Sequence, residues 1–325
     1  MSRLIFVPQF PSKLRYQETW YKEFPKQMGK YFDEVVVLGK SYIDTIRLQE
    51  KIMRSDQHMF SPIHQSILME MDQINEFYNM KIDQKNDFLF LSDLSFPGFF
   101  CNMLYHKPIK NAYAYCHATS LNYLDYFEPV RDSKWLVETG HSKLFKKIFI
   151  GSYYHYAKLT SMEDDNNDWI NTKVVGLPIP PYPIFKEEKI YDIISVARKN
   201  NQKIDNSIED KVEKDFGKIV RKEVNSWEEY YKFLSQAKIL LITSKEDTFN
   251  YSIMEAVMNG TVVLAPNRLA FPELLPREYL YDNYTELKTE IEDVLDGDLS
   301  SIGKLLCNDK CENFFDIMIS EMLKG

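Results

Sequence analysis

The stretch SKEDTFNYSIMEAVMNGTVVLAP, residues 244–266, carries the pattern that decides the fold. Two acids in it, Asp247 and Glu255, lie eight positions apart, and a Gly-Thr pair then leads into the apolar run 262–265. We expect a helix over residues 250–259 and a strand directly after it. A helix followed so closely by a buried strand is typical of a parallel α/β sheet.

The same alternation continues upstream of this stretch. Residues 192–197 and 238–242 are short apolar runs, which predict two more strands. Residues 226–237 between them are amphipathic and begin with Ser226, followed three positions later by Glu229. This spacing is a capping box and predicts the start of a helix.

Five further apolar runs lie in the N-terminal half and are separated by longer polar or amphipathic segments. They are residues 4–7, 34–38, 87–91, 112–116 and 147–151. Strands that alternate with helices form parallel sheets through βαβ units. The chain is therefore predicted to be an α/β protein with two doubly wound, Rossmann-like sheets.

A proline-rich segment, VVGLPIPPYPIF at residues 174–185, separates the two series of strands. Its four prolines stiffen the connection and exclude a central strand there. We therefore place a domain boundary in this segment and expect domains at residues 1–175 and 176–325. The last helix, expected over residues 312–324, can pack on either domain.

The net charge of −8 is divided unevenly along the chain. Residues 1–160 contain 20 Lys and Arg against 17 Asp and Glu, a net charge of +3, and the remaining residues have 20 against 31, a net charge of −11. A polyanionic partner would therefore face the N-terminal half. The simpler interpretation is that the acidic half only keeps its domain soluble.

Cysteine usage and hydropathy favour a cytoplasmic protein, or host cytoplasm if the source is viral. The four cysteines include no C-x-x-C pair, and Cys307 and Cys311 lack nearby histidines, so we expect reduced thiols and no zinc. The start of the chain lacks the apolar core of a signal peptide. No run approaches the about 18 apolar residues of a spanning helix, so no integral membrane contact is expected.

Charged residues follow the predicted strands of the C-terminal half, where ligands of doubly wound sheets bind. Arg198 and Lys203 come after the strand at 192–197, and the next helix is expected to start near Asn250. Two cations and a helix N-terminus suit a diphosphate, with backbone amides near Asn250, Tyr251 and Ser252 as donors.

The two acids of the opening stretch complete such a site. Glu255, inside the helix, can accept hydrogen bonds from ribose hydroxyls. Asp247, ahead of the helix, can accept from a sugar that lies beyond the phosphates. A nucleotide-sugar would use all of these groups.

This order of residues strongly resembles the donor domain of retaining GT-B glycosyltransferases that have an E-x7-E motif. The positions in register are Ser244, Asp247, Phe249, Glu255, Ala256, residues 260–263 and Glu273, together with the Arg198 and Lys203 pair. The resemblance implies two Rossmann-like domains facing a cleft, with an acceptor domain at 1–175 and a donor domain at 176–325. It also implies a nucleotide-sugar donor, commonly a UDP-linked hexose, and no metal or other cofactor.

The resemblance assigns roles residue by residue. Arg198 and Lys203 neutralise the diphosphate, Glu255 binds the ribose, and Asp247 holds the donor sugar. His117 follows the predicted strand at 112–116, where retaining GT-B enzymes often place a histidine that meets the donor sugar.

Two departures from the family pattern stand out. The first acid is Asp rather than Glu, so the adjacent Glu246 remains an alternative to Asp247. The family's N-terminal Gly-Gly is absent, and residues 8–19 occupy its place, with Arg15 as a candidate for the phosphate or the acceptor.

Two acids of the N-terminal half follow predicted strands and are candidates for orienting or deprotonating an acceptor hydroxyl. They are Asp93 and Asp125. Either can instead cap a turn or a helix.

The sequence indicates two classes of acceptor. The wider N-terminal pattern is loosely similar to predicted bacteriophage glycosyltransferases, some of which belong to DNA-hypermodification systems, and this implies the hydroxymethyl group of a modified pyrimidine in DNA. A glycan or a lipid-linked saccharide is the alternative. Because the first acid is Asp rather than Glu, a non-catalytic protein that binds a nucleotide-sugar or nucleic acid is a further alternative. The sequence does not fix the donor base, the donor sugar or the oligomeric state.

Overall fold

The computed structural model describes residues 2–52, 62–124, 127–161, 169–179, 183–197, 203–297 and 311–324. Two candidate site residues, Asp125 and Arg198, lie outside these ranges.

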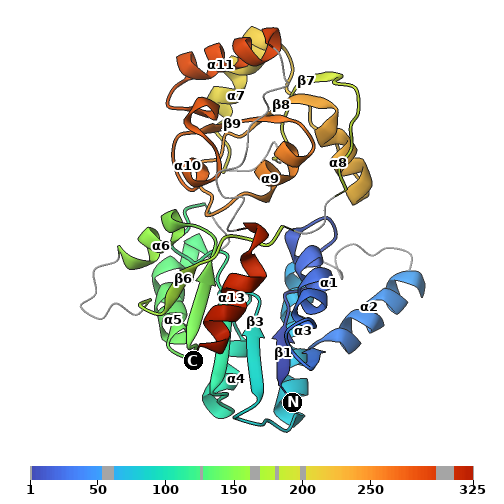
Figure 1. The fold of residues 1–325 in the computed structure, drawn as a ribbon, viewed down its shortest axis with the longest axis vertical. Coiled ribbons are helices and arrows are strands. Elements are labelled where there is room, and N and C mark those ends of the chain that lie inside the picture. Colours follow the sequence, from blue (N-terminus) through green and yellow to red (C-terminus); the bar gives the residue numbers. More distant parts are fainter. Residues whose placement is uncertain are drawn as a thin grey trace.

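Two separate parallel sheets form the framework of the chain (Figure 1). The N-terminal sheet has the order β2-β1-β3-β4-β5-β6, and the C-terminal sheet has the order β10-β9-β8-β7. The strands are β1 (Arg3–Val7), β2 (Glu34–Val37), β3 (Asp87–Leu91), β4 (Asn111–Tyr115), β5 (Lys147–Ile150), β6 (Thr172–Val174), β7 (Tyr191–Ile194), β8 (Ala237–Leu241), β9 (Val262–Pro266) and β10 (Leu280–Tyr281). All their pairings are parallel, which confirms the predicted α/β class with two Rossmann-like sheets.

Helices cover both faces of the N-terminal sheet. One face packs on α1 (Tyr16–Met28) and on the C-terminal helix α13 (Phe314–Leu323). The other face packs on the layer of α3 (Pro62–Asn79), α4 (Phe100–His106), α5 (Arg131–Ser142) and α6 (Tyr153–Thr160), and α2 (Lys40–Ile52) contacts α3. Strands buried on both faces need apolar side chains in both directions, which explains their continuous apolar runs.

After the C-terminal sheet, the last helix returns to the N-terminal sheet, where Figure 1 shows it in red. The Tyr113 hydroxyl of β4 donates to the Met322 carbonyl at 2.8 Å. The Lys147 ammonium of β5 lies 2.5 Å from the Glu321 carboxylate. The last helix therefore belongs by its contacts to the N-terminal sheet.

The C-terminal sheet lies between two helical layers. Its helices are α7 (Asn206–Phe216), α8 (Trp227–Ser235), α9 (Tyr251–Met258), α10 (Phe271–Leu274) and α11 (Tyr284–Asp296), with a short 3-10 turn at Arg277–Tyr279. A second 3-10 turn, Glu128–Val130, precedes α5 in the N-terminal domain. Buried residues of α7 and α11, such as Val212 and Leu287, pack on one face, and those of α8 and α9, such as Leu234 and Ile253, pack on the other.

The helix start predicted at Ser226 is present in the structure. The Ser226 hydroxyl accepts the Glu229 N–H at 3.2 Å, and the Glu229 carboxylate accepts the Asn225 N–H at 2.8 Å. The first bond satisfies a first-turn donor of α8, as the capping pattern requires, and the second engages the N–H of the residue before the N-cap rather than that of Ser226 itself. Within the described part of the chain, no helix combines the length and the apolar character needed to cross a bilayer.

Candidate functional site

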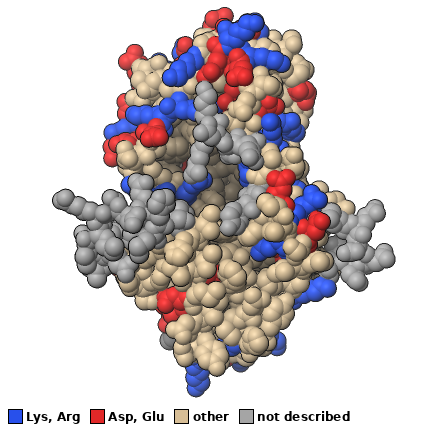
Figure 2. Space-filling view, turned by 180° about the vertical axis from the view of Figure 1, so that it is seen from behind, with Lys and Arg blue, Asp and Glu red and all other residues tan. Residues whose placement is uncertain are grey.

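The carboxyl ends of the two sheets face each other across a cleft of about 1060 Å³. The loop after β1 supplies Arg15 and the start of α1 supplies Tyr16 to one wall, and the C-terminal domain supplies the opposite wall, including Asp247 and Glu255. Figure 2 shows the hollow between the two domains, with lysine and arginine side chains beside it. The cleft is large enough for a nucleotide-sugar, since small-molecule pockets typically measure about 300–1000 Å³.

The start of α9 fixes one of the predicted acids at this cleft. The Asn250 side chain caps the helix, because its Oδ1 atom accepts the Ser252 N–H at 3.0 Å. Its Nδ2 atom donates to Asp247 Oδ2 at 2.8 Å. One asparagine therefore both ends the loop and orients the acid. The Ser252 amide is already engaged by the cap, so a diphosphate would rely on the other amides of the first turn.

Asp247 titrates near neutral pH. Burial raises the pKa of its carboxyl to about 7, while the hydrogen bond from Asn250 and the positive charge of Lys203 work in the opposite direction. The structure thus brings Asp247 and Lys203 close enough to interact. At neutral pH such a carboxyl is only partly ionised, and a cationic or hydrogen-bond-donating ligand raises the ionised fraction.

Glu255 lies in the second turn of α9, where it lines the cleft and is only 5% exposed. The Tyr230 hydroxyl of α8 donates to Glu255 Oε2 at 2.8 Å. The carboxylate of Glu255 is therefore held by a neighbouring helix.

Glu246 points away from the cleft. Its carboxylate lies 2.8 Å from the Lys158 ammonium of α6 and 3.5 Å from the Tyr154 hydroxyl, both in the N-terminal domain. It is absent from the described residues that line the cleft. The placement of the two acids therefore favours Asp247 over Glu246 as the ligand-facing acid.

Glu246 is part of a set of contacts that joins the domains, which we call the junction. The Thr248 hydroxyl donates to the His117 carbonyl at 2.7 Å, and the Ser152 hydroxyl donates to the Thr248 carbonyl at 2.6 Å. The Glu273 carboxylate accepts the N–H groups of Tyr153 and Tyr154 at 2.8 and 2.7 Å. A C-terminal-domain acid therefore caps the N-terminus of α6 in the other domain.

His117 also belongs to the junction through its main chain, and its ring is packed among aromatic side chains. The ring centroids of Tyr16 and Tyr115 are each 4.5 Å from that of His117, and that of Trp20 is 5.0 Å away. Burial lowers the pKa of the imidazole to about 3, so the ring is neutral. Its Nε2 atom is buried and has no hydrogen-bond partner among the described residues.

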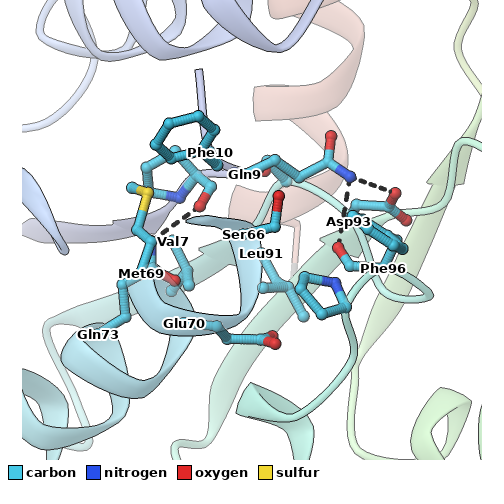
Figure 3. A pocket seen from close by; sticks show the side chains of 13 residues that line it. Val7, Gln9, Phe10, Ser66, Met69, Glu70, Gln73, Leu91, Asp93 and Phe96 are labelled. Carbon is cyan, nitrogen blue, oxygen red and sulfur yellow. Dashed lines mark hydrogen bonds between the residues drawn. The ribbon is translucent and has the colours of Figure 1, made fainter. Parts of the chain in front are cut away.

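Asp93 lies apart from the cleft, in the interior of the N-terminal domain. Its carboxylate accepts the Gln9 amide at 2.7 Å and the Ser95 N–H at 3.0 Å, and burial raises its pKa to about 8. It lines a small cavity of about 10 Å³ together with Glu70 (Figure 3). Asp93 is absent from the described residues that line the cleft, so the structure does not place it against an acceptor there.

Several residues of the cleft and junction were not found by sequence reasoning. Tyr230, Trp227 and Arg221 line the cleft, and Lys158 holds the junction. Glu273 was in register with the family motif, but its capping of α6 in the other domain was not predicted. The sequence pattern placed Tyr230 and Trp227 on a helix without indicating which ligand or acid they would meet.

No known sequence family profile matches the chain. One curated relative, the tRNA-queuosine alpha-mannosyltransferase of Drosophila melanogaster, is 30% identical over 123 residues. This match covers 38% of the chain and 33% of the relative, so the similarity spans about a third of that protein.

Solved structures resemble the chain over its whole length. The N-terminal domain of trehalose-6-phosphate phosphatase from Candida albicans has a TM-score of 0.63 at 12% identity and covers 100% of this chain and 97% of that one. Sucrose-phosphate synthase from Thermosynechococcus elongatus has a TM-score of 0.63 at 11% identity, with coverages of 100% and 98%. HepE from Anabaena in complex with UDP has a TM-score of 0.59 at 12% identity and covers 100% of both chains. These likenesses confirm the GT-B fold.

Proposed function

We propose that the chain is a glycosyltransferase that moves a sugar from a nucleotide-sugar to a hydroxyl acceptor and retains the anomeric configuration. One observation carries the proposal: Asp247, Glu255 and the first turn of α9 converge on a cleft between two Rossmann-like domains. In this proposal residues 176–325 bind the donor and residues 1–175 receive the acceptor, in the cytoplasm, with α13 completing the N-terminal domain.

The donor would lie along the C-terminal wall of the cleft. Lys203, whose charge reaches Asp247, and Arg198 neutralise the diphosphate, and Glu255 accepts from the ribose. Asp247 accepts from the sugar. HepE, a structural neighbour, forms complexes with UDP and with UDP-glucose, which supports a UDP-linked hexose as the first donor to test. The proposal includes no metal or other cofactor.

The transfer step needs one bond to break and one to form on the same face of the sugar. The bond from the anomeric carbon to the diphosphate oxygen breaks, the acceptor oxygen bonds to that carbon, and the acceptor proton passes to the departing diphosphate. A neutral His117 fits this scheme, because a ring whose pKa is about 3 is a weak base. Its role is to accept a hydrogen bond from the sugar at Nε2, and because that atom is buried among aromatic rings, these side chains must rearrange to admit the sugar.

The proposed acceptor is a hydroxyl group on a modified nucleoside of a nucleic acid. The relative named for tRNA-queuosine supports this class, and a hydroxymethylated pyrimidine in DNA is a second member of it. The exposed Arg15 at the cleft and the positive charge of the N-terminal half suit a polyanion. A saccharide acceptor is the alternative, supported by neighbours such as sucrose-phosphate synthase.

Release of nucleoside diphosphate tests the proposal. The purified chain would be incubated with UDP-, GDP- and ADP-linked hexoses, alone or with tRNA, hydroxymethylated duplex DNA, single-stranded DNA or simple glycans. We expect release that rises with one class of acceptor and falls at least about 100-fold in Glu255→Ala and in Arg198→Ala. The exposed acid Glu278 provides the matched control, Glu278→Ala, which should keep the wild-type rate.

The outcomes separate the alternatives. Release stimulated by a nucleic acid supports the proposed acceptor, and release stimulated only by a glycan assigns the saccharide instead. Unchanged release in Glu255→Ala would contradict the donor site. Binding of a nucleotide-sugar without any release would identify a non-catalytic binding protein.

A further inference from the structure

A tyrosine that no sequence motif indicated lies against the acid assigned to the ribose. Tyr230, on α8, points at α9 and donates its hydroxyl to Glu255 Oε2 at 2.8 Å. Both side chains line the cleft. Burial and the neighbouring Glu255 carboxylate raise the pKa of the phenol well above its usual value, so Tyr230 keeps its proton and remains a donor.

We propose that Tyr230 is a positioning residue that fixes the Glu255 carboxylate so that the site selects a ribonucleoside diphosphate over a 2′-deoxyribonucleoside diphosphate. The inference rests on the proposed donor site. A carboxylate accepts hydrogen bonds at both oxygens, and the two adjacent ribose hydroxyls are donors. A bond at Oε2 restricts rotation of the carboxylate, and a fixed acceptor discriminates best against a ligand that lacks one donor.

The helix that carries Tyr230 is itself held in place. Trp227, one turn earlier in α8, stacks on Tyr231 with ring centroids 5.6 Å apart. Its indole N–H donates to Glu18 Oε2 at 3.1 Å, and the same carboxylate oxygen accepts the Leu14 N–H at 3.0 Å. The start of α8 is therefore tied to the N-terminal loop that forms the opposite wall of the cleft. These contacts hold α8 in place and so fix the position of the Tyr230 hydroxyl.

Replacement of Tyr230 by phenylalanine isolates the hydroxyl. The ring of Tyr230 packs against Trp227 and Tyr231 at 5.8 and 5.4 Å, and Tyr230→Phe keeps these contacts. Tyr284→Phe is a matched control in the same domain, because its hydroxyl donates to the Lys211 carbonyl and to Asp215, which are absent from the described cleft lining.

The test is a set of calorimetric titrations on the full chain. UDP, GDP, ADP and CDP would be compared with their 2′-deoxy counterparts in the wild type and both variants. For the base that binds, we expect the wild type to prefer the ribonucleotide by about tenfold or more, since a hydrogen bond to a charged group is strong. Tyr230→Phe should weaken binding of the ribonucleotide by about tenfold and binding of the deoxynucleotide by much less, so that the preference for ribose shrinks. Tyr284→Phe should keep the wild-type preference.

Other results would overturn the inference. An unchanged ribose preference in Tyr230→Phe, with or without a lower Tm, leaves only a structural role for the hydroxyl. If such a variant and the wild type still release nucleoside diphosphate from a nucleotide-sugar, the inference fails and the proposed function stands. If none of the four diphosphates binds the wild type and no donor releases one, the proposed function fails with it.

Discussion

Glu246 and Asp247 are neighbours in the sequence, yet they serve two different regions of the molecule. Glu246 faces the junction and lies 2.8 Å from Lys158 of the other domain. Asp247 faces the cleft and is held by Asn250. The short loop between β8 and α9 sends the two side chains in opposite directions. An acidic pair in a motif can therefore divide into an acid that joins two domains and an acid that faces the cleft between them.

The two carboxylates also differ in how their charge is compensated. Glu246 has a cation in direct contact, and both side chains of the pair are largely buried. Asp247 receives a neutral amide donor and a longer-range charge from Lys203, and burial raises its pKa to about 7. The charge of the junction acid is compensated by a direct ion pair within the protein, whereas the cleft acid is held by a neutral donor and its pKa is raised by burial.

The largest expected effect separates the two acids in transfer. Asp247→Ala should reduce the rate of sugar transfer by about 100-fold or more, since it removes a group that would contact the sugar. Glu246→Ala should reduce the rate less than about tenfold, because its carboxylate serves the junction. Single-turnover assays with a saturating donor would measure both. A larger loss in Glu246→Ala than in Asp247→Ala would assign the sugar-binding role to Glu246 instead.

A smaller effect is expected at the junction and concerns stability. Lys158→Met leaves Glu246 without its cation in a largely buried position and should lower the free energy of unfolding by about 2 kcal/mol. The double variant Lys158→Met/Glu246→Met should regain much of the loss, because no charge is then left unpaired. Denaturant unfolding of the single and double variants checks this. Equal stability of all three proteins would show that the ion pair contributes nothing to the junction.

The smallest expected effect is a pH dependence from Asp247. If the ionised acid binds the donor, as proposed, donor affinity should rise about tenfold between pH 6 and 8 and level off above. Stability should change in the opposite direction. With its pKa raised in the folded state, this carboxyl stabilises the fold most below pH about 4, and the contribution is lost as the pH rises towards 7. Asp247→Asn should remove this pH dependence from both the donor affinity and the free energy of unfolding.

Comparison with the variant isolates Asp247 from other buried acids. Burial raises the pKa of Glu70 to about 7 and that of Asp93 to about 8, so both contribute to the pH dependence of stability. Their contributions are common to the wild type and to Asp247→Asn. Identical donor-affinity profiles in the two proteins would contradict the assignment of Asp247 to the cleft.

Much of the architecture could be predicted because it depends on near neighbours in the sequence. The apolar run at 238–242 became β8 with a shift of one residue, and Ser226 caps α8 as its spacing with Glu229 indicated. The candidate site was predictable to the level of its elements: Asp247 lies ahead of α9 and Glu255 inside it. The functional roles of these residues stay predictions.

Contacts between distant segments could not be predicted in the same way. The strand-end position of His117 gave no sign that Tyr16 and Trp20, about a hundred residues earlier, pack against its ring. The strand-end position of Asp93 likewise did not reveal that the carboxylate is buried beneath Gln9. A side chain's burial depends on what other segments bring to it, and local periodicity contains no such information.

The sequence by itself determined the alternation of strands and helices, the two Rossmann-like units and the spacing of Asp247 and Glu255, because these follow from apolar periodicity and capping within a few residues. Only the tertiary structure decided that Glu246 pairs with Lys158, that Tyr230 holds Glu255, and that α13 returns to the N-terminal sheet. The physical reason is that these contacts join segments tens to hundreds of residues apart. Their geometry is set when the two domains and their helices pack together.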